Sequence, residues 1–233
     1  MTQDISIDLE TLGKNPQALI LSIGAVKFNR HTGVIRDEFY RVIDIEAEGG
    51  GIMDASTVAW WMRQEPAARD AVFGEGVEKV PLMHALVAFS EWLGYNEELE
   101  DGKWPDVYLW QRGDKDAQWL TSAYEGTGLR VPFPYWAVGD QRTLCNAIPT
   151  TYPGRAGVHH NALADAIYQA GCIHAAFDRI KQLDTLRVER TEDGLRVRCM
   201  NDVGTAAVYV DPVGLAHEVF DAQAVALPGS ETE

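Results

Sequence analysis

The chain has 233 residues, of which 46% are hydrophobic, and its formal net charge is −15, from 20 lysines and arginines against 35 aspartates and glutamates. This size and apolar content predict one well-buried domain with an appendage, without the run of roughly 18 apolar residues of a membrane span and without a signal peptide. The acidic balance argues against wrapping of long duplex nucleic acid, because tight duplex binding uses many lysine and arginine contacts to phosphates.

The first predicted element is a half-buried strand, because isoleucine and leucine alternate with polar residues over positions 5–10. Asp8 and Glu10 lie two positions apart and therefore share one face of this strand. Two carboxylates this close repel each other, which raises one pKa unless a cation lies between them. Oxygen ligands suit Mg²⁺ or Mn²⁺. The alternative for this segment alone is a solvated edge strand.

Two further strands are predicted over 18–28 and 34–42, which completes a three-stranded antiparallel meander. A glycine-rich loop over 44–53 leads to a helix over 56–62, with Asp54 or Ser56 as its cap. Trp60 and Trp61 point to different faces of this helix. We expect one of them in the core and the other as a stacking surface for a base, with simple packing of both as an equal alternative.

The middle of the chain alternates between helical and extended patterns. Helices are predicted over 66–72, 82–93, 116–126 and 141–147, and a short buried strand over 107–110. Loops are predicted over 96–104, which is acidic, over 132–136, which is aromatic, and over 150–158.

A long helix is predicted after His160, because apolar residues recur at helical spacing. The apolar positions are Leu163, Ile167, Ala170, Phe177 and Ile180. Asp165 lies off this stripe, and His160 comes just before the helix, where it can swing over whatever Asp165 binds. Alone, this pattern is typical of a capping region with one surface carboxylate. Together with Asp8 and Glu10, it indicates a two-metal nuclease site.

The hydrophobic pattern of the sequence changes near residue 185. Short alternating segments over 186–190, 195–200 and 205–210 predict a small β-meander, and the polar end from 228 to 233 is predicted to be disordered. We therefore expect a main domain over 1–184, a β appendage over 185–227 and a tail over 228–233.

The three cysteines at 145, 172 and 199 are odd in number and dispersed. They show neither a disulfide framework nor metal-ligand spacing. We expect them to be buried thiols in a reducing cytosol, and hence a cytoplasmic protein.

Five segments follow one another between about Ile5 and Phe177: SIDLETLG, ILSIGAVKF, STVAWWMRQEPAAR, DQRTL and HHNALADA. This series resembles the DnaQ-like DEDDh 3′–5′ exonucleases, and within them the phage and actinobacterial exonuclease/exoribonuclease subgroup. The resemblance implies an α/β, RNase H-like mixed sheet, with an antiparallel meander plus parallel strands, flanked by helices. The C-terminal β appendage lies outside the shared core.

The resemblance also implies roles for individual residues. Asp8, Glu10 and Asp165 would be ligands of two divalent cations, Mg²⁺ or Mn²⁺. His160 would be the general base that takes a proton from the attacking water, with His159 as its neighbour.

A central aspartate must complete the set. The family places it after a strand, as glycine, two residues, an aromatic and then aspartate, whereas WQRGDKDAQWL is one residue shorter and has no aromatic there. Counting back from Leu120 favours Asp116, and counting forward from Gly113 leaves Asp114 open.

The implied function is a 3′–5′ exonuclease, bacterial or phage-encoded, that releases 5′-mononucleotides from single-stranded ends or short overhangs of RNA or DNA. Candidate substrate-binding residues are Thr11, Leu12, Trp60, Trp61, Arg112 and His159. One alternative is a lapsed RNase H-like module that binds nucleic acid or a protein. Another is a metal-dependent phosphohydrolase of small nucleotides. The expected partner is a nucleic-acid 3′ end, without a membrane, and a homodimer is left open.

Overall fold

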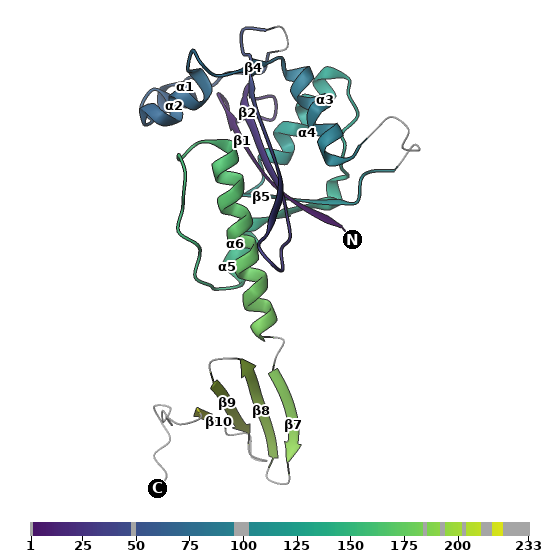
Figure 1. Ribbon diagram of the computed structural model, residues 1–233, viewed down its shortest axis with the longest axis vertical. Helices are drawn as coiled ribbons and strands as arrows, with labels where there is room; N and C mark the ends of the chain where they lie inside the picture. The colour runs from purple at the N-terminus through teal and green to yellow at the C-terminus, as the bar shows by residue number, and fades with distance from the viewer. Residues whose placement is uncertain are drawn as a thin grey trace. The chain divides into compact units, whose positions relative to one another are not determined.

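The structure is a computed structural model that describes residues 2–47, 50–95 and 103–183, together with the backbone of four strands between 186 and 220 (Figure 1). The chain divides into two compact units, Met1–Ala176 and Phe177–Glu233. The first unit contains the predicted exonuclease core.

A six-stranded mixed sheet forms the centre of the first unit, with the strand order β4-β3-β2-β1-β5-β6. Strand β1 pairs antiparallel with β2, and β2 with β3, whereas β3–β4, β1–β5 and β5–β6 are parallel. The predicted fold class of a meander extended by parallel strands is therefore confirmed. The strands are β1 Gln3–Thr11, β2 Ile20–Phe28, β3 Ile35–Ile43, β4 Lys79–Val80, β5 Val107–Gln111 and β6 Val138–Asp140.

Helices cover both faces of this sheet. Figure 1 shows α3 and α4 on one side and α6 with α5 on the other. The helices are α1 Ala55–Trp61, α2 Pro66–Phe73, α3 Leu82–Leu93, α4 Asp116–Thr127, α5 Gln141–Ala147 and α6 Ala162–Leu183, with a short 3-10 helix at Tyr135–Ala137. Of the two predicted caps of α1, Asp54 is the one that accepts a hydrogen bond from the Ser56 backbone N–H.

Strand β1 separates the hydrophobic core from the polar side of the sheet. Its Ile5, Ile7 and Leu9 are buried in a cluster with α3 and α4 side chains. The opposite face points toward α6, where Gln169 Nε2 donates a hydrogen bond of 2.7 Å to Asp8 Oδ1. The alternation seen in the sequence thus places the carboxylates of β1 under α6.

Gly24 allows α6 to approach the sheet this closely. It pairs with Asp8 across β1 and β2, and a Cβ at Gly24 would lie 2.2 Å from the carbonyl carbon of Ala162. A glycine is therefore required where the first turn of α6 crosses β2. This contact brings Asp165, in the same turn, over β1.

Replacing Gly24 by alanine is expected to destabilise the fold by about 1–3 kcal/mol, the usual cost of overpacking, because backbone atoms of α6 must move. Urea denaturation measures this change. Gly126 in α4 is the matched control, since nothing lies within 4 Å of its added Cβ. Its alanine variant should gain up to about 1 kcal/mol through helix propensity. Equal effects of the two substitutions would contradict the close approach.

The second unit contains a four-stranded antiparallel sheet in the order β10-β9-β8-β7. Its strands are β7 Leu186–Thr191, β8 Gly194–Asn201, β9 Gly204–Val210 and β10 Ala216–Phe220. Three of them coincide with predicted segments, and β10 was not predicted. The predicted division at 184/185 remains a prediction. The predicted tail and most of the predicted acidic loop lie outside the described residues.

No helix within the described ranges is long and apolar enough to span a membrane.

Candidate active site

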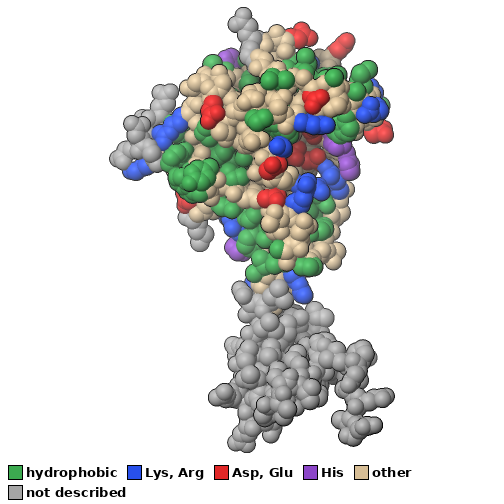
Figure 2. All heavy atoms as spheres, turned by 180° about the vertical axis from the view of Figure 1, so that it is seen from behind, with side chains coloured by type: hydrophobic (Ala, Val, Ile, Leu, Met, Phe, Trp, Pro, Cys, Tyr) green, Lys and Arg blue, Asp and Glu red, His purple; other side chains and the backbone are tan. Residues whose placement is uncertain are grey.

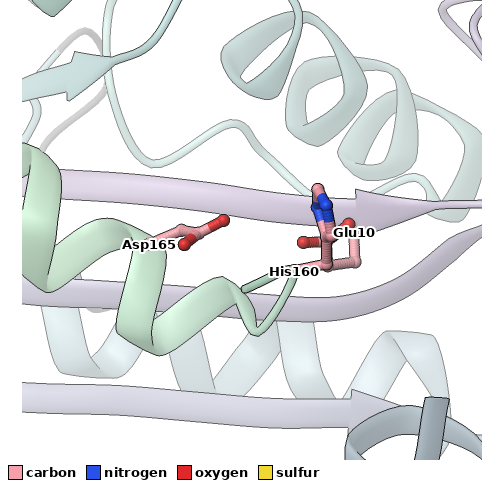
Figure 3. Close-up of side chains that lie close together, drawn as sticks. All are labelled: Glu10, His160 and Asp165. Atoms are coloured by element: carbon pink, nitrogen blue, oxygen red, sulfur yellow. The ribbon is translucent and has the colours of Figure 1, made fainter. Parts of the chain in front are cut away.

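A cluster of carboxylate and histidine side chains in the first unit joins β1 to the start of α6. Figure 3 shows Glu10 on β1 together with His160 and Asp165. One potential ligand atom from each of these three residues lies within 4.8 Å of the others. Glu10 of the first predicted strand and the His160–Asp165 pair, which lie about 150 residues apart in the sequence, therefore meet in space.

Asp8 and Asp116 extend this cluster. Burial, followed by the charges of Asp116, Glu10 and Asp165, raises the pKa of Asp8 well above its ordinary value. Burial also raises the pKa of Glu10 to about 8, with Asp165 and Asp116 adding to the shift. These mutual effects show that the four carboxyl groups form one electrostatic unit.

The structure places Asp116, and not Asp114, at this centre. Asp116 opens α4, is buried, and accepts a 2.9 Å hydrogen bond from the backbone N–H of Leu9, between the two carboxylates of β1. Burial raises its pKa to about 7, although that hydrogen bond opposes the rise. Asp114 is exposed and lies 3.7 Å from the Lys115 ammonium. The register counted back from Leu120 agrees with this position, and the catalytic role of Asp116 remains a prediction.

Asp116→Asn is expected to reduce hydrolysis by at least about 10²-fold, the usual cost of one lost electrostatic partner at a reacting centre. Asp114→Asn, two residues away and exposed, is the matched control and should change the rate less than about twofold, because its carboxylate faces solvent. Initial rates on a single-stranded oligonucleotide measure both. Comparable losses would mean that the shortened loop rearranges during the reaction.

His160 is held in a special conformation before α6. Its φ angle is 62°, in the left-handed region that non-glycine residues rarely adopt. Its ring lies 4.7 Å from the Trp60 ring and 6.5 Å from the Trp61 ring, edge to face. Burial lowers its pKa below the ordinary 6.5. A neutral imidazole at neutral pH, held toward carboxylates, has the properties of a general base.

The two tryptophans of α1 differ in burial. Trp61 is 2% exposed, and its Nε1 donates a 2.9 Å hydrogen bond to the carbonyl of Thr11. Trp60 is half-buried and lines a groove beside Glu10 with Lys14 and Arg63. Trp60 therefore remains the candidate stacking surface, and Trp61 belongs to the core.

The other predicted substrate-binding residues occupy different surroundings. Thr11 is buried at the edge of this groove, whereas Leu12 packs in the core with Leu21 and Trp61. His159 is exposed next to His160. Arg112 is exposed after β5, where its charge acts on Tyr168 and Cys172 of α6. The structure thus places Thr11 beside the groove, and it places the side chain of Leu12 in the core.

Three residues of the site were missed in the sequence. Gln169 contacts Asp8, Arg155 pairs with Asp165, and Gln111 Oε1 accepts the Ala117 backbone N–H at the start of α4. Gln169 could have been found, because it lies four residues after Asp165 and therefore on the same helix face. Arg155 lies in a segment without periodicity and gave no such signal.

The metal-free protein is expected to lose stability as pH rises. Glu10 titrates at 4.5 in its ordinary state and at about 8 when folded, so the folded chain binds more protons than the unfolded chain between these values. Stability must then fall with rising pH across that window. This window corresponds to about 3 kcal/mol. We therefore expect the melting temperature in EDTA to drop by roughly 6–12 °C from pH 5.5 to pH 8, at about 2–4 °C per kcal/mol.

Thermal melts at both pH values measure this drop. Glu10→Gln should weaken it, and the exposed Glu38→Gln on β3 should not. A melting temperature that rises with pH would contradict the shared burial of these carboxyl groups.

A family model described as a 3′–5′ exoribonuclease Rv2179c-like domain matches residues 3–177. Among curated proteins, no sequence match to the chain was found.

Several solved exonuclease structures resemble the chain. E. coli exonuclease I in complex with a dT13 oligonucleotide aligns with a TM-score of 0.56 and 10% identity, over 90% of this chain and 55% of that one. The zinc-bound form of an E. coli ExoI–ssDNA complex aligns with a TM-score of 0.55 and 9% identity, over 90% of this chain and 54% of that one. The nuclease domain of 3′hExo, a DEDDh family member bound to rAMP, aligns with a TM-score of 0.47 and 16% identity, over 74% of this chain and 90% of that one.

At such low identities the likeness to exonuclease I shows a shared fold, and the chain spans about half the length of that enzyme. The family match covers the six-stranded sheet and the whole carboxylate cluster. The predicted 3′–5′ exonuclease class is confirmed at the level of the family. The chain belongs to the Rv2179c-like 3′–5′ exoribonuclease domain family.

Proposed function

We propose that the chain removes 5′-mononucleotides one at a time from single-stranded 3′ ends, with RNA as the first substrate to test because the family is described as exoribonucleases. The observation that carries this proposal is the cluster of Asp8, Glu10, Asp116 and Asp165 with His160 at its edge. A carboxylate cluster with a neutral histidine fits metal-assisted phosphodiester hydrolysis.

The donor set fits divalent cations. Burial raises the pKa values of Asp8, Glu10 and Asp116, and repulsion within the cluster adds to the rise at Asp8 and Glu10, so the cluster is short of positive charge. Oxygen ligands favour Mg²⁺ or Mn²⁺. Asp8, Glu10, Asp116 and Asp165 would hold the two cations. When bound, such a pair lowers the pKa of an attacking water and neutralises the leaving 3′ oxygen.

His160 accepts the proton of the attacking water in this proposal. Burial keeps its pKa below 6.5, so the imidazole is neutral and able to take a proton at pH 7. The edge contact with Trp60 restricts the ring. Asn161 fixes the chain just after it, because its Oδ1 accepts the Ala164 backbone N–H at 3.0 Å.

The groove beside Glu10 would take the end of the substrate strand. Trp60 offers a stacking face worth about 1–3 kcal/mol per base, and Lys14 and Arg63 offer positive charges for phosphates. Figure 2 shows acidic side chains beside basic and histidine side chains on one face of the described part. With a net charge of −15, such local groups favour a short single-stranded end over long duplex.

The test is a digest of matched single-stranded RNA and DNA oligonucleotides with Mn²⁺ or Mg²⁺, with products identified by mass. Release of 5′-mononucleotides from the 3′ end, abolished by EDTA and by Asp8→Asn, is the expected result. Binding without release in both metals would favour a lapsed binding module. Faster hydrolysis of a free nucleotide ester than of the oligonucleotide would favour a small-nucleotide phosphohydrolase.

We also propose the cytoplasm as the site of action. Cys145 and Cys172 are buried free thiols in the described chain, as a reducing compartment allows. A homodimer and the β appendage as a separate domain remain predictions, which light scattering and limited proteolysis would test.

A further inference from the structure

Arg155 reaches into the carboxylate cluster from the segment between α5 and α6. Its Nη2 forms an ion pair with Asp165 Oδ1. Its guanidinium carbon also lies 5.1 Å from the ring centroid of Tyr168, one turn further along α6. Arg155 therefore has two contacts on α6, one with a carboxylate and one with an aromatic ring.

The positive charge of Arg155 acts on Glu10 and His160 as well as on Asp165. Burial raises the pKa of Glu10 to about 8, and the Arg155 charge opposes that rise. Burial lowers the pKa of His160, and Arg155 lowers it further. Glu10, His160 and Asp165 are the three residues whose ligand atoms lie within 4.8 Å of one another. The guanidinium thus supplies a positive charge to the same carboxylates that would hold a cation.

A divalent cation held by Asp165 and the Arg155 guanidinium would repel each other, because both are positively charged. This repulsion is relieved when one member of the Arg155–Asp165 pair moves away. Asp165 is fixed in the first turn of α6, where its backbone N–H bonds to the Asn161 carbonyl. Arg155 lies within a largely exposed stretch over 151–159 that forms neither helix nor strand. Arg155 is therefore the member of the ion pair that can move away from the other.

We propose that Arg155 is an exchangeable counter-ion, which holds Asp165 in the metal-free protein, leaves it when a cation binds, and then holds a phosphate of the substrate strand. This inference rests on the proposed function. A guanidinium presents a planar fork of donors that matches a phosphate as well as a carboxylate. The freed side chain would find such a phosphate at the cluster when a nucleic-acid 3′ end is bound.

Two consequences follow for binding. The Arg155–Asp165 pair must break before the cation binds, so it weakens metal affinity in the absence of substrate. Substrate phosphate gives the displaced guanidinium a new partner, so substrate and metal should each tighten the binding of the other by the same factor.

Arg155→Met tests the first consequence, since methionine keeps an unbranched chain against Tyr168 and removes the charge. Calorimetric titration of Mn²⁺ without nucleic acid should give a dissociation constant about tenfold tighter than for the wild type, the size expected for one charge-assisted hydrogen bond. Arg155→Lys should stay near the wild type. Arg69→Met, at an exposed arginine on α2, is the matched control and should change nothing.

The second consequence is tested with a single-stranded oligoribonucleotide at saturating Mn²⁺. The KM of Arg155→Met should rise by about tenfold, which corresponds to one lost phosphate contact. Thermal melts with Mn²⁺ show whether the variant is folded, and its metal-induced rise in melting temperature should exceed that of the wild type.

Unchanged or weaker Mn²⁺ affinity in Arg155→Met would overturn the counter-ion role, even if the wild type binds Mn²⁺ and hydrolyses RNA. Tighter Mn²⁺ binding with an unchanged KM would overturn the transfer to phosphate. A wild type that binds no Mn²⁺ would instead overturn the proposed function, and this inference with it.

Discussion

Replacing Asp8 by asparagine is expected to reduce hydrolysis by more than about 10³-fold, because one lost electrostatic group at a reacting centre already costs about 10²–10³. The charges of Asp116, Glu10 and Asp165 all act on Asp8, which places it among the carboxyl groups proposed to hold the cations. The fold should persist, since removing one charge relieves repulsion within the cluster. Rates on a single-stranded oligonucleotide and thermal melts in EDTA measure the two effects.

Metal stabilisation is the sharper criterion for the same variant. Mn²⁺ should raise the melting temperature of the wild type and have much less effect on Asp8→Asn. Glu38→Gln, at an exposed carboxylate on β3, should respond to Mn²⁺ as the wild type does. If Mn²⁺ stabilises Asp8→Asn as much as the wild type, the assignment of Asp8 as a metal ligand is wrong.

The polar face of β1 could be predicted because a strand has a period of two residues. Once Ile5, Ile7 and Leu9 are assigned to the core, Asp8 and Glu10 must lie on the other face, and the structure shows them there.

The same reasoning was wrong for α6: Asp165 lies on the buried face with Ala162 and Ala166, whereas Leu163 and Ile167 of the predicted apolar stripe are only half-buried. The face of α6 that packs on the sheet carries small and polar side chains, so apolar spacing alone did not identify it.

Other features depend on contacts between residues that are far apart in the sequence, and hydrophobic periodicity did not indicate them. Strands β4 and β6 are two and three residues long, and their parallel pairing with β3 and β5 defines them as strands. The choice between Asp116 and Asp114 depended on how a shortened loop closes against Leu9. The Arg155–Asp165 pair joins an irregular segment to a helix. Such contacts are set by tertiary packing, so the sequence pattern alone could not give them.

His160→Ala is expected to lower the rate by about 10²–10⁴-fold, the range for one general base, while Mn²⁺ affinity stays within about twofold of the wild type. Its imidazole lies near enough to Glu10 and Asp165 to be a ligand instead, so calorimetric Mn²⁺ titration separates the two roles. His159→Ala, at the exposed neighbour, is the matched control and should cost little. Because burial holds the pKa of His160 below 6.5, the wild-type rate should stay near its full value at pH 7 and fall only at more acid pH. Weakened Mn²⁺ binding in His160→Ala would show that this histidine is a metal ligand. A larger loss of rate in His159→Ala than in His160→Ala would assign the general base to His159.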